Sequence, residues 1–402
     1  MPEPLAPPVS KSDSHRALVL AEVCEGSHER LLPPAIDRPR DVDVLSKGLQ
    51  TLRGPTGELD CLDAGAPFRF LVTQAALKPN AAWRFIGTPR LAERPHEALL
   101  EALRRSLGVT IRHGATLWPL TVDTGVRRFV DPFRVSGVES SQFTSSLLLG
   151  AARLVREGTS PVTVEIDGEA TSAGYVALTV AWMRRFGFEV AVGENTLTVT
   201  GWHAVPAPNE LPGDWSSLTY LLPLSWKSGV GVRHVDFEAA HPDRAFASHL
   251  EAVGLKFATR DGVTSVTGTL ERALEVDASV CPDSVPALVA MALVSPAPST
   301  FVRCGVLRLK ESDRLDALTT LVRLIGGRAD VDGERLTVTP PSTPRGGTFD
   351  GRDDHRLVMA ATVAASLLGV TIPVRGTEAV AKSFPGFWRE AAKVGIERAE
   401  AT

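Results

Sequence analysis

The sequence is poor in cysteine, and the cysteines it has are isolated. Cys24, Cys61, Cys281 and Cys304 form no CxxC pair and no Cys/His spacing that is typical of a zinc site. Four scattered thiols in a chain of 402 residues fit a reducing compartment better than a disulfide framework. We therefore expect neither disulfide bonds nor a zinc site.

Three other features are missing. The first residues, MPEPLAPP, have neither the basic nor the apolar region of a signal peptide. No uncharged apolar run reaches the roughly 18 residues that a transmembrane helix needs. The formal net charge is −4, whereas nucleic-acid-binding proteins usually have a strong basic excess. With 44% hydrophobic and 22% charged residues, the composition is that of a soluble globular enzyme. We expect a cytoplasmic protein with neither a nucleic-acid nor a membrane partner.

The chain is too long for one ordinary hydrophobic core, so its length predicts two domains. It also repeats itself. A helix that ends at a glycine and is followed by a β-hairpin recurs every 67 to 79 residues. Glycine suits the left-handed position at the end of a helix, and the alternating Val/Thr stretches that follow predict strands. The glycines are Gly108, Gly187, Gly254, Gly326 and, in a shortened copy, Gly395.

A second repeat alternates with the first. It is a short polar motif that opens a nearly all-apolar helix, which belongs in a core. Its copies begin at Ser10, Asp63, Ser140, Asp214, Asp283 and Asp353. Ser and Asp at such positions are explained by simple N-capping. N-capping does not explain why Arg, Lys and His recur in the first turn of buried helices, where they are disfavoured. Those cations favour an anionic ligand, such as a phosphate or carboxylate, at the helix N-termini.

The motifs themselves point to one family. The segment SKSDSHR at residues 10–16 resembles the first substrate motif of EPSP synthases, and LKESDR at residues 309–314 is the most specific string in the chain. Further matching segments follow the family's order along nearly the full length. They are residues 63–69, 88–95, 140–142, the pair Ser172 and Tyr175, Asp283, and residues 354–356 and 381–385.

The resemblance implies an α/β fold of two similar domains. Each consists of three βαβαββ units around buried parallel helices, an inside-out α/β barrel, with the active site in the inter-domain cleft. Residues 10–211 would form the first enolpyruvyl-transferase domain, and residues 1–9 with 212–402 the second. Hinges would lie near Ser10 and near Pro212 and Gly213. The N-terminus looks shortened, so we expect the strand that it usually adds to the second domain to be missing.

The resemblance also implies a reaction. An enzyme of this family transfers the enolpyruvyl group of phosphoenolpyruvate to the 5-hydroxyl of shikimate 3-phosphate and releases phosphate, in the shikimate pathway to chorismate and the aromatic amino acids. It needs no cofactor and no metal. We expect a monomer whose partners are these two small-molecule substrates.

Roles can be transferred residue by residue. Asp283 corresponds to the general base, and Glu311 and Lys11 to the groups that move the other protons, without separate roles for the two. The residues expected to bind shikimate 3-phosphate are Lys11, Ser12, Arg16, Ser140, Ser141, Gln142, Ser172, Tyr175, Asp283 and Lys310. Those expected to bind phosphoenolpyruvate are Lys11, Gly65, Arg94, Gln142, Arg314, His355, Arg356 and Lys382.

Each motif has a plainer explanation when it is taken alone. Glu311 and Arg314 could form only a surface ion pair, and His355 could be a core histidine. Ser140 with Ser141 could be an N-cap, and Tyr175 could be core packing. If the LKESDR segment starts a helix, Lys310 and Arg314 have the i,i+4 spacing that places them on one face.

The sequence departs from the family pattern in three places. Asp63 stands where asparagine is frequent, and a carboxylate there would repel an anionic ligand unless it is paired or protonated. Ala66 and Pro67 follow Gly65 where threonine is usual, and Val306 stands where Asn or His often holds the shikimate ring. Gly65 leaves space for the inhibitor glyphosate, so we expect sensitivity to it.

Two other functions remain open at this stage. A related enolpyruvyl transferase acts on UDP-N-acetylglucosamine, but that family has Lys-Asn in place of Lys11-Ser12 and a reactive cysteine shortly before the arginine that aligns with Arg94. The departures also allow a non-catalytic, anion-binding paralogue, although Lys11, Asp283 and Glu311 are retained.

Overall fold

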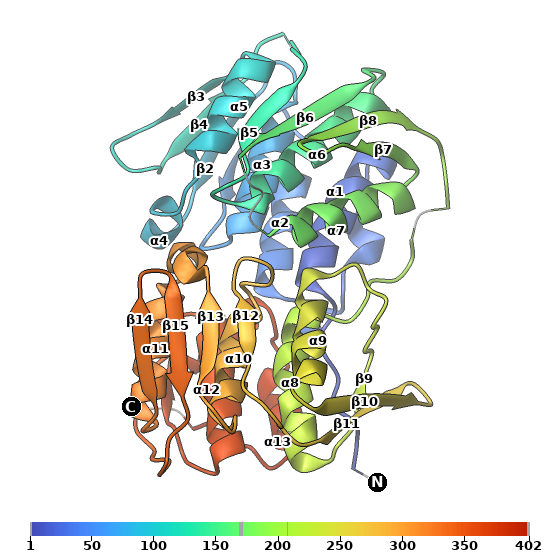
Figure 1. Cartoon of the computed structure of the whole chain (residues 1–402). Helices are drawn as coiled ribbons and strands as arrows, with labels where there is room; N and C mark the ends of the chain where they lie inside the picture. Colours follow the sequence, from blue (N-terminus) through green and yellow to red (C-terminus); the bar gives the residue numbers. More distant parts are fainter. Residues whose placement is uncertain (1, 127, 169–171, 207, 400–402) are drawn as a thin grey trace. The chain divides into compact units, whose positions relative to one another are not determined.

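The computed structural model describes residues 2–126, 128–168, 172–206 and 208–399 (Figure 1). The chain divides into two compact units. Unit 1 consists of Met1–Ser10, Pro34–Pro39 and Pro212–Thr402, and unit 2 of Lys11–Pro33 and Arg40–Leu211. The sequence did not predict that the short segment Pro34–Pro39 groups with unit 1. The segment that leaves unit 1 after Ser10 pairs with the segment that returns to it at Pro212. Val9 forms an isolated bridge with Gly213, and the Ser10 amide donates to the Pro212 carbonyl at 2.8 Å.

Unit 2 contains two sheets and their helices. Its helices are α1 (Lys11–Glu25), η1 (Glu29–Leu31), α2 (Arg40–Thr51), α3 (Gly65–Ala76), α4 (Pro89–Ala92), α5 (Glu97–Leu107), α6 (Ser141–Arg156) and α7 (Ala173–Arg185). Its strands are β1 (Thr56–Asp60), β2 (Ala82–Ile86), β3 (Thr110–His113), β4 (Leu120–Asp123), β5 (Phe133–Ser136), β6 (Val162–Asp167), β7 (Phe188–Val192) and β8 (Thr196–Trp202).

The two sheets of unit 2 have the same topology. Their strand orders are β1-β2-β4-β3 and β5-β6-β8-β7. In each sheet the first pair is parallel and the other pairs are antiparallel. A parallel pair needs a crossover, which α3 and α6 provide, whereas the antiparallel pair is closed by a hairpin. Each sheet with its helices is therefore one βαβαββ unit, as the resemblance to the family implies.

Unit 1 has a third copy of this sheet and two shorter ones. Its helices are η2 (Ala35–Asp37), α8 (Trp215–Ser228), η3 (Pro242–Arg244), α9 (Ala245–Ala252), α10 (Val285–Ala292), η4 (Cys304–Leu309), α11 (Arg314–Leu324), α12 (His355–Leu368), η5 (Thr377–Lys382) and α13 (Phe387–Ala392). Its strands are β9 (Val232–Arg233), β10 (Leu255–Arg260), β11 (Val263–Gly268), β12 (Glu275–Asp277), β13 (Ser299–Val302), β14 (Arg328–Asp332), β15 (Arg335–Thr339), β16 (Phe349–Asp350) and β17 (Val374–Arg375). The order β12-β13-β15-β14 repeats the pattern of unit 2.

As expected, the described residues before α1 form no regular strand, but they add an isolated bridge. Leu5 forms a parallel bridge with Val232 of β9, and its amide donates to the Gly231 carbonyl at 2.8 Å. The sheet β10-β11-β9 thus gains a short parallel neighbour in the position that β12 has beside β13. Leu5 is fully buried, so the side chain anchors the segment even though only one residue pairs.

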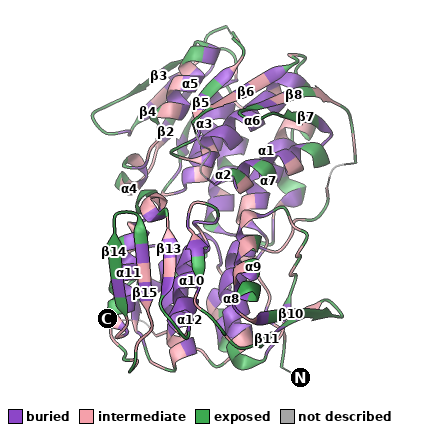
Figure 2. Cartoon of the chain, in the orientation of Figure 1, coloured by how far each residue is buried: buried purple, intermediate pink, exposed green. Residues whose placement is uncertain are grey.

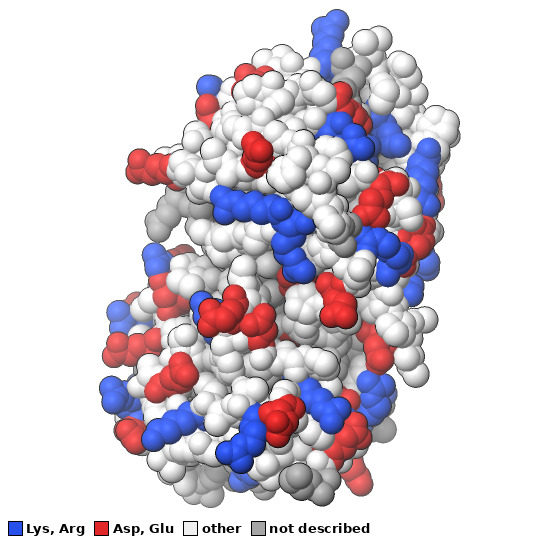
Figure 3. Space-filling model, turned by 90° about the vertical axis from the view of Figure 1, so that its right-hand side faces the viewer, with Lys and Arg blue, Asp and Glu red and all other residues white. Residues whose placement is uncertain are grey.

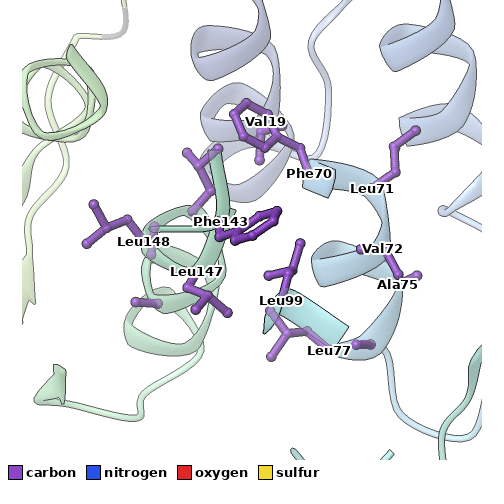
Figure 4. Close-up of a cluster of buried hydrophobic side chains, with 14 of the residues drawn as sticks. Val19, Phe70, Leu71, Val72, Ala75, Leu77, Leu99, Phe143, Leu147 and Leu148 are labelled. Carbon is purple, nitrogen blue, oxygen red and sulfur yellow. The ribbon is translucent and has the colours of Figure 1, made fainter. Parts of the chain in front are cut away.

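The second sequence repeat corresponds to buried helices. α1, α3, α6, α8, α10 and α12 each begin within two residues of the polar motifs that predicted them. Every residue of α10 is buried, as is the first half of α12 (Figure 2). In unit 2, Val19 of α1, Phe70 of α3, Leu99 of α5 and Phe143 of α6 belong to one cluster of buried side chains (Figure 4). No helix among the described residues is both long and apolar enough to cross a membrane.

The first repeat is confirmed as well. α5 ends at Gly108, which has φ +65° and donates its amide to the Arg104 carbonyl, and the β3–β4 hairpin follows. A Cβ in this left-handed conformation is strained, which explains the glycine. The shortened last copy at Gly395 follows α13 and forms no hairpin within the described residues.

Candidate active site

In unit 1, the predicted residues meet at the N-termini of three helices. Asp283 lies just before α10, Arg314 is the first residue of α11, and Arg356 is the second residue of α12. Arg314 Nη1 donates to Asp283 Oδ1 at 2.9 Å, and Arg356 Nη2 donates to Asp283 Oδ2 at 3.1 Å. Lys310 Nζ lies 3.5 Å from Asp283 Oδ1. One carboxylate therefore holds three cations from two segments, residues 309–314 and the start of α12.

The same network contains the other predicted groups. Arg314 Nη2 donates to Glu311 Oε2 at 2.8 Å, and Lys382 Nζ lies 3.8 Å from Glu311 Oε1. The side chains of Arg314 and Lys382 are almost completely excluded from solvent. The side chains of Asp283, Lys310 and Glu311 keep 20%, 18% and 17% exposure, so solvent reaches these three groups.

Asp354 was missed as a site residue, although it stands inside a quoted motif. It is fully buried, caps α12 by accepting from the Arg356 amide at 3.0 Å, and accepts from Arg314 Nε at 2.8 Å. Arg352 and Asp353 before it both have left-handed φ values, +51° and +52°. Such backbone costs about 1–3 kcal/mol per residue and persists where the surrounding structure requires it. Here it aims the Asp354 carboxylate at Arg314.

Two expectations for this network need correction. Lys310 and Arg314 do not share a helix, because Lys310 has extended backbone and α11 starts only at Arg314. They approach each other because both bind Asp283. The plain surface-pair explanation of Glu311 and Arg314 is also wrong, since Arg314 is fully buried. His355 is fully buried, and its Nδ1 lies 3.8 Å from Asp354 Oδ1.

The charges of the network act on each other. Burial alone would raise the pKa of Asp283, but the attraction of Arg356, Lys310 and Arg314 outweighs it and holds the pKa well below its usual value. For Arg314, burial opposes the charged form, yet the three carboxylates Asp354, Glu311 and Asp283 raise its pKa. Asp283 is therefore ionised and weakly basic.

In unit 2, Arg16 joins three helices. It lies on α1, and its side chain donates to Thr179 Oγ1 at 2.8 Å and to the Tyr175 carbonyl at 3.0 Å, both on α7, and to Ser145 Oγ of α6 at 3.4 Å. Its guanidinium also lies 5.8 Å from the ring centroids of Phe70 and Tyr175. Burial lowers the pKa of Arg16 to about 10, with the Asp13 carboxylate acting against the shift, so the side chain stays charged at neutral pH.

Lys11 is the first residue of α1 and forms an ion pair that sequence reasoning missed. Its Nζ lies 3.2 Å from Oδ2 of Asp41 in the first turn of α2. The two side chains are 13% and 5% exposed. Nothing in the local pattern distinguished Asp41 from an ordinary acidic residue near a helix start. Ser12, the next residue, offers its carbonyl to Arg16 Nη1 at 2.8 Å.

The N-termini of α6 and α7 supply the remaining polar groups of unit 2. Ser140 caps α6 by accepting from the Gln142 amide at 3.3 Å, and Ser141 is buried beside it. Gln142 Oε1 accepts from Arg69 Nη1 at 2.5 Å, which orients its amide group. Ser172, before α7, is buried and has φ +57°.

Gly65 and Arg94 lie against each other. Gly65 opens α3, and a Cβ on it would lie 2.6 Å from Nη1 of Arg94. With any other residue here, the Arg94 guanidinium would have to move from its position. Asp63, two residues earlier, is paired: Arg40 Nη2 donates to its Oδ1 at 2.6 Å. The sequence predicts that the Asp63 carboxylate would repel an anionic ligand, and the positive charge of Arg40 compensates this carboxylate within unit 2.

A family model described as EPSP synthase (3-phosphoshikimate 1-carboxyvinyltransferase) matches residues 35–391. The chain belongs to the EPSP synthase family. It is 34% identical to the 3-phosphoshikimate 1-carboxyvinyltransferase of Methanopyrus kandleri, over 98% of this chain and 95% of that one. It is 33% identical to the enzyme of the same name from Ralstonia nicotianae, over 95% and 94% of the two chains.

Solved structures agree with the fold of the EPSP synthase family. An EPSP synthase from Acinetobacter baumannii superposes with a TM-score of 0.72 at 19% identity, over 99% of this chain and 97% of that one. An enolpyruvyl transferase from Streptomyces tendae gives a TM-score of 0.69 at 15% identity, over 98% and 94%. The predicted α/β fold of the family is confirmed.

Proposed function

We propose that this chain is a 3-phosphoshikimate 1-carboxyvinyltransferase, in which the two compact units are its two enolpyruvyl-transferase domains. It transfers the enolpyruvyl group of phosphoenolpyruvate to the 5-hydroxyl of shikimate 3-phosphate and releases phosphate. The observation that supports this best is the network around Asp283, where one ionised carboxylate meets Lys310, Arg314 and Arg356. Membership of the EPSP synthase family supports the same reaction. We expect the enzyme to act as a cytoplasmic monomer.

In the proposed reaction, the 5-hydroxyl oxygen forms a bond to C2 of phosphoenolpyruvate while C3 gains a proton. The resulting tetrahedral intermediate then loses phosphate and a proton from C3, which leaves an enolpyruvyl ether. A base must take the hydroxyl proton and an acid must supply the proton to C3. We assign the first task to Asp283 and the second to Glu311 and Lys11 together.

The ion pairs suggest how Asp283 becomes a base. Its three cations hold its pKa low, which makes it a weak proton acceptor. The phosphate and carboxylate of phosphoenolpyruvate would draw Arg314 and Arg356 into bonds of their own, because guanidinium groups bind such anions bidentately. With less positive charge on Asp283, its pKa rises and it can accept the hydroxyl proton.

The other side chains would bind the substrates. Arg94, Lys382 and the backbone at Gly65 would join Arg314 and Arg356 on phosphoenolpyruvate, together with Gln142 and His355. Shikimate 3-phosphate would be bound by Ser12, Arg16, Ser140, Ser141, Gln142, Ser172, Tyr175 and Lys310. Both acidic and basic side chains are spread over the face shown in Figure 3.

Phosphate release tests the proposal. Purified protein is mixed with both substrates, and each substrate is omitted in turn as a control. We expect release that needs both substrates and that Asp283→Ala abolishes. Asp330→Asn, which changes an exposed carboxylate of the same unit, should keep the wild-type rate. Wild-type protein that folds and binds shikimate 3-phosphate without releasing phosphate would favour the non-catalytic alternative.

A further inference from the structure

Arg40 stands where helix physics disfavours it. It is the first residue of α2, close to the positive end of the helix dipole, where acidic residues stabilise and basic residues do not. Asp41 and Asp43 in the same turn follow the rule. A residue that breaks a local rule often has a role outside its own helix. The contact of Arg40 lies elsewhere: its Nη2 donates to Asp63 Oδ1 at 2.6 Å.

Asp63 lies at the edge of the proposed phosphoenolpyruvate site. It stands two residues before Gly65, whose backbone lies against the Arg94 guanidinium. Its side chain is 25% exposed, so its charge is not hidden by burial. An uncompensated carboxylate two residues before Gly65 would repel an anionic ligand that binds there.

We propose that Arg40 is a positioning residue for phosphoenolpyruvate, which acts by neutralising and holding Asp63. The proposal rests on the proposed function, since it names how one of the two substrates is admitted. It concerns unit 2 alone, because Arg40, Asp63, Gly65 and Arg94 all belong to it.

A plain surface ion pair is the competing explanation. Arg40 is 45% exposed, and pairs of this kind contribute little to folding stability. The two explanations differ in what they predict for catalysis. A surface pair leaves the kinetic constants unchanged, whereas a compensated charge at the substrate site changes the KM for phosphoenolpyruvate selectively.

Steady-state phosphate release from four variants separates these explanations: Arg40→Ala, Arg40→Lys, Asp63→Asn and the double variant Arg40→Ala/Asp63→Asn. We expect Arg40→Ala to raise the KM for phosphoenolpyruvate about tenfold, because it exposes an uncompensated charge near the ligand. The KM for shikimate 3-phosphate should stay within about twofold of wild type by the same reasoning. Arg40→Lys, which keeps the charge, should recover most of the loss.

The double variant is the decisive one. Removing the carboxylate together with its partner should return the KM for phosphoenolpyruvate to near the wild-type value, and Asp63→Asn alone should not raise it. Arg134→Ala, which breaks an exposed pair with Glu165 elsewhere in unit 2, is the matched control and should change nothing. Thermal unfolding midpoints close to wild type show that every variant folds.

Each result that contradicts our expectation overturns a specific part of the proposal. An unchanged KM for phosphoenolpyruvate in Arg40→Ala overturns the positioning role and leaves a surface ion pair. A double variant as impaired as Arg40→Ala overturns it too, since Arg40 would then act independently of Asp63. Wild-type protein without turnover overturns the proposed function itself, and the role of the pair with it.

Discussion

Arg314 and Asp354 form an ion pair that is completely excluded from solvent, with Arg314 Nε donating to Asp354 Oδ2 at 2.8 Å. The same carboxylate accepts the amide of Arg356, so it positions both arginines that we propose to bind phosphoenolpyruvate. Because the Asp354 side chain is completely buried, it does not contact a substrate itself, and its role is to position the two arginines.

Replacing Asp354 should destabilise unit 1. Asp354→Asn removes the charge that compensates Arg314 in the interior, and breaking a buried pair from one side costs roughly 3 kcal/mol. Urea unfolding of the variant against wild type measures this loss. Asp316→Asn, which breaks an exposed pair with Arg352, is the control and should change stability by less than about 1 kcal/mol. Equal unfolding midpoints for the two variants would contradict the interpretation.

Asp41 should matter for the rate more than for binding. It holds Lys11, so Asp41→Asn frees the ammonium group from its 3.2 Å contact and loosens a proposed proton-transfer group. Misplacement of such a group lowers kcat, by about tenfold or more here. Rate measurements at saturating substrate check this, with Asp123→Asn on an exposed strand residue as control. A variant whose kcat equals that of wild type would show that Lys11 needs no partner.

Gly65→Ala should weaken phosphoenolpyruvate binding. The new methyl group would lie 2.6 Å from Nη1 of Arg94 and 3.0 Å from Cζ, so the guanidinium must move. Such overpacking costs about 1–3 kcal/mol, which corresponds to a KM raised about tenfold. Substrate titrations measure it. The same titrations with glyphosate test our expectation that the wild type is sensitive and the variant less so; a wild-type curve that stays flat would refute the first half.

Acid should destabilise unit 2 through two buried histidines. Burial, with Lys11 and Arg16 nearby, lowers the pKa of His15 to about 3, and burial lowers that of His96 to about 2. In the unfolded chain both titrate near 6.5, so the unfolded state binds more protons below that pH. Stability should therefore fall by about 2 kcal/mol per histidine between pH 7 and pH 5.

His15→Asn isolates one of these contributions. Urea unfolding at pH 7 and pH 5 should show a smaller loss for the variant than for wild type, by about 2 kcal/mol. His203→Asn changes an exposed histidine and should leave the pH dependence as it is. If His15→Asn and wild type lose the same stability on acidification, His15 is not the group that responds.

The repeats show how much of this fold the sequence contains. A polar motif before an apolar run located α1, α3, α6, α8, α10 and α12, because capping and burial are local properties of a helix. Glycines such as Gly108 located helix ends for the same reason. Because both patterns recur along the chain, they together predict where these helices and the hairpins after the glycines lie in the whole sequence. The N-terminal bridge at Leu5 was not predicted, because a single paired residue leaves no periodic signal in the sequence.

The candidate site was predictable from the sequence only in part. The fold, the family and the residue types at the helix N-termini were predictable from the sequence, because they follow from local pattern and from motif order. The pairing of each carboxylate with its cation became known only from the folded structure. Lys11 with Asp41, Arg40 with Asp63 and Arg314 with Asp354 are separated by 23 to 40 residues and join different elements. Their attraction depends on distance and burial in space, and spacing along the chain encodes neither.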